Sequence, residues 1–142
     1  MLVRDVMTRS PVTIQIDESL HTAQLRMADA NCRRLPVMDD TGHVCGIITD
    51  RDVRLALHSS LVMRERWQDD MLLGHTEVSA CMTPDPVCIA PDAPLKDAIQ
   101  MMLTESFSGM PVVDHDRHLV GVITVTDLLR TLSTLLVADD SC

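Results

Sequence analysis

The chain has 142 residues, 46% of them apolar and 23% charged, a balance typical of one globular domain or two very small ones. With 12 basic and 21 acidic residues the net charge is −9, and Trp67 and Phe107 are the only aromatic residues, so nucleic acid is not expected as the main partner. No apolar run approaches the ~18 residues of a membrane span, and residues 1–10 lack the apolar core of a signal peptide, so we expect a cytoplasmic protein.

The first half of the chain predicts alternating strands and helices. In chain order the predicted elements are a strand at 12–14, a helix capped by Asp17 and Ser19, strands at 35–38 and 43–48 joined by the turn 39–42, and a helix from Thr49 through Leu57. Residues 58–77 contain Trp67 but no Gly/Ser-rich run, which favours a mostly ordered connector; a flexible tether is the alternative.

The second half of the chain repeats the first. Shifted by 75 residues, positions 6–54 align with 81–129 without a gap, and 17 of the 49 pairs are identical, where average residue usage would give about three. Each copy reads β-α-β-β-α, and a unit of roughly 50–60 residues buries only a modest core alone. We therefore predict an α+β fold in which two such repeats pack face to face with pseudo-twofold symmetry.

The predicted boundaries follow from this duplication. They are 1–57 for repeat 1, 58–77 for the connector, 78–137 for repeat 2 and 138–142 for a tail. The final helix carries an apolar stripe over residues 128–136, which is typical either of an intrachain core or of a subunit contact.

The cysteines do not favour a disulfide framework, and the histidines do not favour a metal site. The five cysteines are odd in number and form no C-x-x-C, which favours free and mostly buried thiols in a reducing compartment. His115 and His118 flank Asp116 beside Asp114, but these residues fall in a predicted turn, where a solvated loop is favoured over a metal site.

Two motifs, each present twice, resemble the cystathionine-β-synthase (CBS) domain. The first, Leu-Pro-Val-Met-Asp at 35–39, recurs as Met-Pro-Val-Val-Asp at 110–114. The second is Gly-Ile-Ile-Thr-Asp-Arg-Asp at 46–52, which recurs as Gly-Val-Ile-Thr-Val-Thr-Asp at 121–127. The resemblance covers about 98 residues and implies a tandem CBS pair, or Bateman module. Such modules bind adenosine-containing ligands in clefts between the repeats, and they often form dimers.

Physical chemistry supports a ligand at these motifs. A helix N-terminus suits a phosphate, and the hydroxyls of Thr49 and Thr124 stand where a strand passes into a helix. Asp52 and Asp127 follow three residues later, where an acceptor-only carboxylate suits ribose hydroxyls. Further candidates, from the aliphatic surface for adenine and from the resemblance, are Ile47, Val122, Ser108, Gly109 and Thr126. Thr-x-x-Asp is also a capping box, which needs no ligand but is compatible with one.

Arginines distinguish the two copies. Arg33, Arg34 and Arg51 belong to copy one, whereas copy two has Ser108, Gly109 and Thr126 at these positions. Guanidinium groups bind phosphate bidentately, so we expect phosphate mainly at copy one and a weaker, less charged or empty site at copy two. Solvated surface charge is the alternative reading of these arginines.

The sequence leaves three functional interpretations to weigh. The first is a regulatory module that binds AMP, ADP or ATP without any cofactor, forms a homodimer and signals to a partner protein. The second is a dimerisation scaffold with vestigial pockets. The third, an enzyme, is disfavoured because no nucleophile elbow, H-E-x-x-H or P-loop motif occurs.

Overall fold

The computed structural model describes residues 1–57 and 66–140, and it divides the chain into two compact units. Unit 2 is the continuous segment Val12–Pro86, and unit 1 joins Met1–Pro11 to Val87–Cys142. The prediction of an α+β protein built from two repeats is confirmed. We describe each unit by itself.

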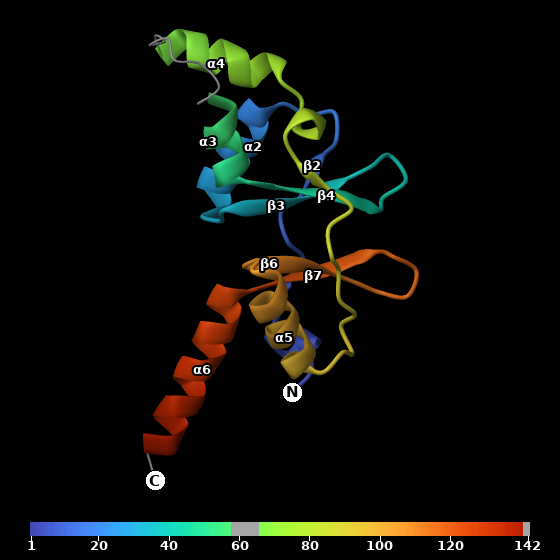
Figure 1. The fold of residues 1–142 in the computed structure, drawn as a ribbon, viewed down its shortest axis with the longest axis vertical. Coiled ribbons are helices and arrows are strands. Elements are labelled where there is room, and N and C mark those ends of the chain that lie inside the picture. Colours follow the sequence, from blue (N-terminus) through green and yellow to red (C-terminus); the bar gives the residue numbers. More distant parts are fainter. Residues whose placement is uncertain (58–65, 141–142) are drawn as a thin grey trace. The chain divides into compact units, whose positions relative to one another are not determined.

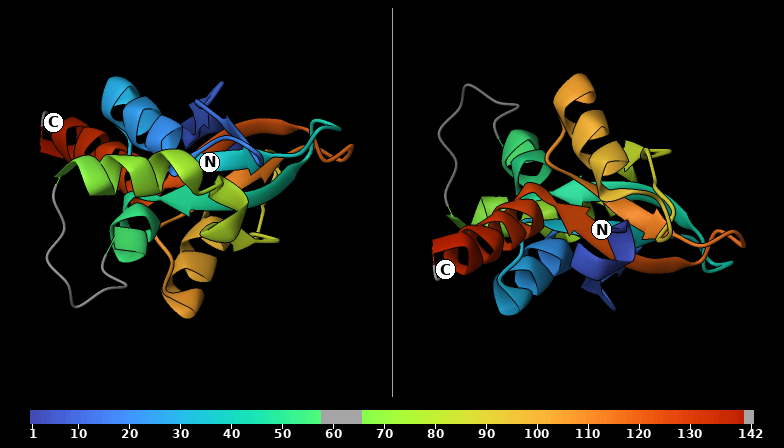
Figure 2. Two further views of the ribbon diagram at one scale, coloured as in Figure 1. Left: turned by 90° about the horizontal axis from the view of Figure 1, so that it is seen from above. Right: turned by 90° about the horizontal axis from the view of Figure 1, so that it is seen from below.

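Unit 2 is a four-stranded sheet covered by helices on one face (Figure 1). Its elements are β2 (Ile14–Gln15), α2 (Leu20–Ala30), β3 (Arg34–Met38), β4 (Val44–Thr49), α3 (Asp50–Leu57), α4 (Arg66–His75), the 3-10 helix η1 (Val78–Ala80) and β5 (Thr83–Pro84). The strand order is β2-β3-β4-β5, with β2 parallel to β3 and the other pairs antiparallel. The view from above shows α4 lying over α2 and α3 (Figure 2).

Unit 1 repeats this plan with fewer elements. They are α1 (Val3–Val6), β1 (Thr8–Arg9), α5 (Leu95–Glu105), β6 (Gly109–Val113), β7 (Leu119–Thr124) and α6 (Val125–Asp140). The strand order is β1-β7-β6, and a parallel bridge between Ile89 and Val112 stands where β2 pairs with β3 in unit 2. The helices α5 and α6 diverge from each other (Figures 1 and 2).

The opening segments of the two sequence repeats are exchanged between the units. Strand β1, at the start of the chain, pairs antiparallel with β7, and β5, at the start of the second repeat, pairs antiparallel with β4. Val3 lies in the core of unit 1 and its counterpart Val78 lies in the core of unit 2, and both are 0% exposed. Each compact unit therefore combines most of one sequence repeat with the first turn and strand of the other.

Two glycines permit the exchanged strands to approach. A Cβ placed on Gly121 would lie 2.7 Å from both the Thr8 carbonyl oxygen and the Met7 sulfur. A Cβ on Gly46 would lie 3.0 Å from the Thr83 carbonyl oxygen and would also meet the Met82 sulfur. A side chain at Gly121 would displace the backbone of β1, whereas one at Gly46 would need the Met82 side chain to move and the Thr83 carbonyl to give slightly.

Most predicted elements are confirmed, with two shifts. Both strands of the first hairpin and the helix after Thr49 form as predicted, and Ser19 caps α2 by accepting a hydrogen bond from Thr22 N at 3.2 Å. The first strand lies at Ile14–Gln15 instead of 12–14, because its parallel pairing with β3 begins at Ile14. Helix α6 continues to Asp140, through residues assigned to a tail.

The connector and the cysteines are described only in part. Residues 66–75 form α4, whereas residues 58–65 lie outside the described residues. The expectation of a mostly ordered connector is therefore tested only in its second half. Cys32, Cys45, Cys81 and Cys88 are free thiols, but they are half-buried, not buried as expected. Burial raises the pKa values of the last three, which lowers their nucleophilicity at neutral pH.

The apolar stripe of α6 is exposed. Leu128 packs partly against the core of unit 1, but Leu129, Leu132, Leu135 and Leu136 are each half or more exposed. Of the two readings of this stripe, intrachain core is therefore wrong for these four leucines. Among the described helices none is both long and apolar enough to cross a membrane.

Candidate functional site

The first candidate site is the junction between β4 and α3, which a reciprocal pair of hydrogen bonds shapes. The Thr49 amide donates to Asp52 Oδ2 at 2.9 Å, and the Asp52 amide donates to Thr49 Oγ1 at 3.2 Å. This is the predicted capping box, and it satisfies two amides at the start of α3 that have no partner within the helix. The box also fixes a hydroxyl and a carboxylate next to each other at a helix N-terminus.

Three arginines lie in the chain segments that form this first junction. Arg34 is the strand partner of Thr49, and the Arg33 carbonyl oxygen accepts a hydrogen bond from Asp50 N at 2.9 Å. Arg51 lies in the first turn of α3. Arg33 and Arg51 are exposed and Arg34 is half-buried. Burial lowers the pKa of Arg34 while Asp50 opposes that shift, and a guanidinium remains charged at neutral pH.

The junction between β7 and α6 has the same backbone plan without counterparts of these three arginines. Gly109 pairs with Thr124, and the Val125 amide donates to the Ser108 carbonyl oxygen at 3.0 Å. The Thr124 amide donates to Asp127 Oδ2 at 2.9 Å, and the Asp127 amide donates to Thr124 Oγ1 at 3.2 Å. The structure thus brings the predicted polar residues of each copy together.

The two aspartates differ in their remaining contacts. Thr124 Oγ1 also donates to Asp127 Oδ2 at 3.0 Å, and Thr8 Oγ1 donates to Asp127 Oδ1 at 3.0 Å. Asp127 is 6% exposed, whereas Asp52 is only partly buried. Within residues 1–57 and 66–140, Asp52 Oδ1 accepts no hydrogen bond, and Thr49 Oγ1 donates none to Asp52.

The predicted apolar residues and Thr126 lie at the same junctions. Ile47, on β4, is half-buried and pairs with Thr83 of the exchanged strand β5. Val122, on β7, pairs with Thr8 and is 6% exposed, so it offers much less surface to a purine than expected. Thr126 is exposed at the position of Arg51.

Sequence reasoning missed Thr8, which belongs to the second junction although it lies 119 positions before Asp127. A signal was present in the repeat, because the Met-Thr pair at residues 7–8 recurs at 82–83. Conservation between copies indicates that the pair matters to each unit, but it does not say to which sheet the pair attaches.

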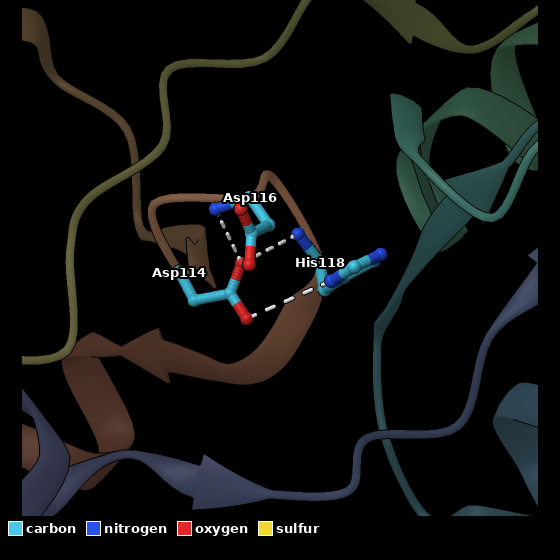
Figure 3. A group of neighbouring side chains, drawn as sticks. All are labelled: Asp114, Asp116 and His118. Carbon is cyan, nitrogen blue, oxygen red and sulfur yellow. Dashed lines mark hydrogen bonds and ion pairs between the residues drawn. The ribbon is translucent and has the colours of Figure 1, made fainter.

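The turn between β6 and β7 gathers Asp114, Asp116 and His118 (Figure 3). Asp114 Oδ1 accepts from the amides of Asp116 and His118, both at 2.9 Å, and these bonds lower the pKa of Asp114. Asp39 shapes the turn of the other hairpin in the same way, with Thr41 in the position of Asp116. The cluster therefore follows from a turn that both repeats use.

The sequence and the fold have clear relatives. Residues 3–59 and 77–134 match the CBS domain family. A CBS domain-containing protein of Dictyostelium discoideum is 35% identical over 136 residues, which cover 96% of this chain and 94% of that protein. Homoserine O-acetyltransferase of Methanococcoides burtonii is 31% identical over 130 residues, which span only 24% of that enzyme.

Solved structures agree with this assignment. A protein of Vibrio cholerae assigned to acetoin utilization (AcuB) superposes with a TM-score of 0.81 at 29% identity, covering 100% of this chain and 97% of that one. The CBS domain pair of protein MJ0100, solved with 5′-methylthioadenosine and S-adenosyl-L-methionine, has a TM-score of 0.80 at 27% identity, covering 94% and 97%. With two copies of the motif, two matching sheets and relatives of this kind, the chain belongs to the CBS domain family and contains a tandem CBS pair.

Proposed function

We propose that this CBS pair is a regulatory module that binds an adenosine-containing nucleotide at the junction between β4 and α3. One observation carries the proposal: Asp52 is half-buried beside a helix N-terminus, and its Oδ1 accepts no hydrogen bond among the described residues. A carboxylate oxygen in this setting is suited to accept ribose hydroxyls. The MJ0100 pair, which holds adenosine derivatives, supports the ligand class.

The arginines favour a phosphorylated ligand. The chain carries a net charge of −9, so an anion needs local positive charge to approach. Arg33 and Arg51 are exposed at the first junction, and within the described part of the chain neither makes a side-chain hydrogen bond or ion pair. Their guanidinium groups therefore remain available to phosphate oxygens, which favours AMP, ADP or ATP over an uncharged nucleoside.

Titration calorimetry with AMP, ATP and S-adenosylmethionine tests this assignment. We expect Asp52→Asn to weaken AMP binding about 10- to 100-fold, because it removes a charged acceptor of ribose hydroxyls. Arg51→Thr installs the residue found at position 126 and should cost about tenfold. Asp127→Asn is the matched control at the other junction. Equal losses from both aspartate variants, or no adenosine compound bound by the wild type, would refute the proposal.

A regulatory role needs a partner. The Dictyostelium discoideum relative, matched along 94% of its length, is named for its CBS domain, whereas homoserine O-acetyltransferase is matched over only 24% of its length. We therefore propose no catalytic activity for this chain. Binding would act by favouring one of two conformations, since a ligand shifts an equilibrium only through differential affinity. The free thiols fit the reducing conditions of the cytoplasm.

Homodimerisation through α6 is a second proposed function, favoured by its exposed leucines. Leu129, Leu132, Leu135 and Leu136 are 50–60% exposed along one stripe. We propose a second copy as the occupant, in antiparallel orientation, because Arg130 of each helix would then lie nearer to Asp139 and Asp140 of the other copy than in parallel pairing. Parallel pairing would instead align the helix dipoles and bring the carboxylates together.

The apolar surface of the leucines offsets the lower part of the cost of association, which corresponds to a concentration-dependent dimer. Burying a half-exposed leucine contributes about 1 kcal/mol, so eight leucines contribute about 8 kcal/mol. Association costs about 4–15 kcal/mol. We expect Leu132→Glu with Leu136→Glu to give a monomer in sedimentation equilibrium, and Leu25→Glu on the exposed face of α2 to leave the dimer intact. A wild type that stays monomeric at high concentration would contradict this pairing.

A further inference from the structure

The hydroxyl of Thr8 is bound differently from that of its counterpart Thr83. Both threonines begin an exchanged strand, and they have equivalent pairing partners: Thr8 of β1 pairs with Val122 of β7, and Thr83 of β5 pairs with Ile47 of β4. Thr8 Oγ1 donates to Asp127 Oδ1 at 3.0 Å. Among the residues that the structure describes, Thr83 makes no corresponding bond to Asp52. Identical side chains at equivalent positions therefore engage one aspartate and not the other.

Asp127 consequently has protein donors on both carboxylate oxygens. Its Oδ2 accepts from the Thr124 amide at 2.9 Å and from the Thr124 hydroxyl at 3.0 Å. Its Oδ1 accepts from Thr8 and lies 3.8 Å from Arg130 Nη1. The residue is 6% exposed. A ribose hydroxyl that approaches Oδ1 must therefore compete with the hydroxyl of Thr8 at a group with little exposed surface.

We propose that Thr8 is a specificity-determining residue that closes the second junction to nucleosides. The Thr8 hydroxyl bonds Asp127 Oδ1, whereas the equivalent oxygen of Asp52 at the first junction accepts no hydrogen bond among the described residues. The two motifs are alike in sequence but therefore differ in binding. A ligand at the second junction must break a hydrogen bond to a charged, buried group, which reduces its affinity. This role presupposes that CBS junctions of this chain bind adenosine compounds, as proposed above.

The position of Thr8 links the second junction to the start of the chain. Thr8 follows α1, which is held to unit 1 by hydrogen bonds from Val3 N to the Ala93 oxygen and from Arg4 N to the Pro91 oxygen, both 2.9 Å. Binding at the second junction and attachment of the Thr8 hydroxyl compete for the same carboxylate oxygen. By thermodynamic reciprocity, any change that loosens residues 1–11 should strengthen binding there, and the reverse.

Thr8→Val tests the proposal because it removes the hydroxyl at nearly constant volume. The probe is adenosine, since the second junction lacks counterparts of Arg33, Arg34 and Arg51, and its Arg130 is already paired with Asp127. By titration calorimetry we expect wild type to bind adenosine at the first junction and only weakly at the second, and Thr8→Val to bind it at the second junction about tenfold more tightly than wild type does. Thr8→Ser, which keeps the hydroxyl, and Thr83→Val, the matched change at the other junction, should behave as wild type. Circular dichroism establishes that each variant is folded, and Thr8→Ala replaces Thr8→Val if the latter is not.

Each result decides the question. A second site in Thr8→Val, absent from Thr8→Ser and Thr83→Val, supports the role of Thr8. Unchanged stoichiometry and affinity in Thr8→Val overturn it, and so does loss of binding, because Thr8 would then contact the ligand. A wild type that binds no adenosine compound refutes the proposed function at the first junction, while Thr8→Val still tests whether the second can be opened.

Discussion

Replacing Gly121 by alanine should detach an exchanged strand from its sheet. The added Cβ would lie 2.7 Å from the Thr8 carbonyl oxygen, a backbone atom that cannot move without shifting β1. Overpacking of this kind costs about 1–3 kcal/mol. If β1 shifts, the hydrogen bond from Thr8 to the charged Asp127 is lost as well, at about 1.5–3 kcal/mol. We expect Gly121→Ala to lower the free energy of unfolding by about 3 kcal/mol.

Urea unfolding followed by far-ultraviolet circular dichroism measures this loss. Gly74→Ala is the matched control, because Gly74 lies in α4 and a Cβ there meets nothing within 4 Å. It should stabilise the protein by about 0.5–1 kcal/mol through helix propensity. If Gly121→Ala unfolds within about 0.5 kcal/mol of wild type, close contact between β1 and β7 does not hold the exchanged segment in place.

The structure predicts the direction of three further effects, on pH-dependent stability, on the thermal midpoint and on the rate of thiol labelling. Arg26 donates a hydrogen bond to Glu18 and lowers its pKa from the ordinary 4.5, so the stability from this pair is present above pH 4.5 and is lost as the pH falls through the lowered pKa. Glu18→Gln should therefore cost about 0.5–1 kcal/mol at neutral pH, with a difference from wild type that disappears in acid unfolding. Arg117 has φ +66°, and the other hairpin has Gly42 at the equivalent position. Arg117→Gly should therefore raise the thermal midpoint, because it relieves about 1 kcal/mol of left-handed backbone strain. An unchanged or lower midpoint would contradict this. Burial raises the pKa of Cys88, so a thiol reagent at neutral pH should label it more slowly than in urea, and equal rates would contradict its half-buried position.

Much of the fold followed from the sequence because the repeat supplied each element twice. The hairpins around residues 39–42 and 114–117 and the caps at Thr49 and Thr124 were predictable from turn residues and from Thr-x-x-Asp spacing. These features are local, and local hydrogen bonds decide them. The fold class followed from the same local patterns together with the duplication.

The exchange of opening segments was not predictable, because it is a long-range choice. Strands β1 and β5 have two residues each, too few for a periodic pattern, and either could in principle extend either sheet. The unequal surroundings of Asp52 and Asp127 were hidden for a related reason, since both sit in the same motif. The leucine stripe of α6 had the correct period, but periodicity does not say whether a face is covered.

The order of segments along the chain also shapes how the protein is made. Unit 2 is an uninterrupted insertion between the two pieces of unit 1, so all of its residues leave the ribosome before unit 1 is complete. The N-terminal strand must wait for β7, more than a hundred positions downstream, before it finds its partner. Closing such a long loop is slow relative to local pairing. Synthesis should therefore yield folded unit 2 first, with an unpaired N-terminal segment that docks only when the remaining strands of unit 1 have been made.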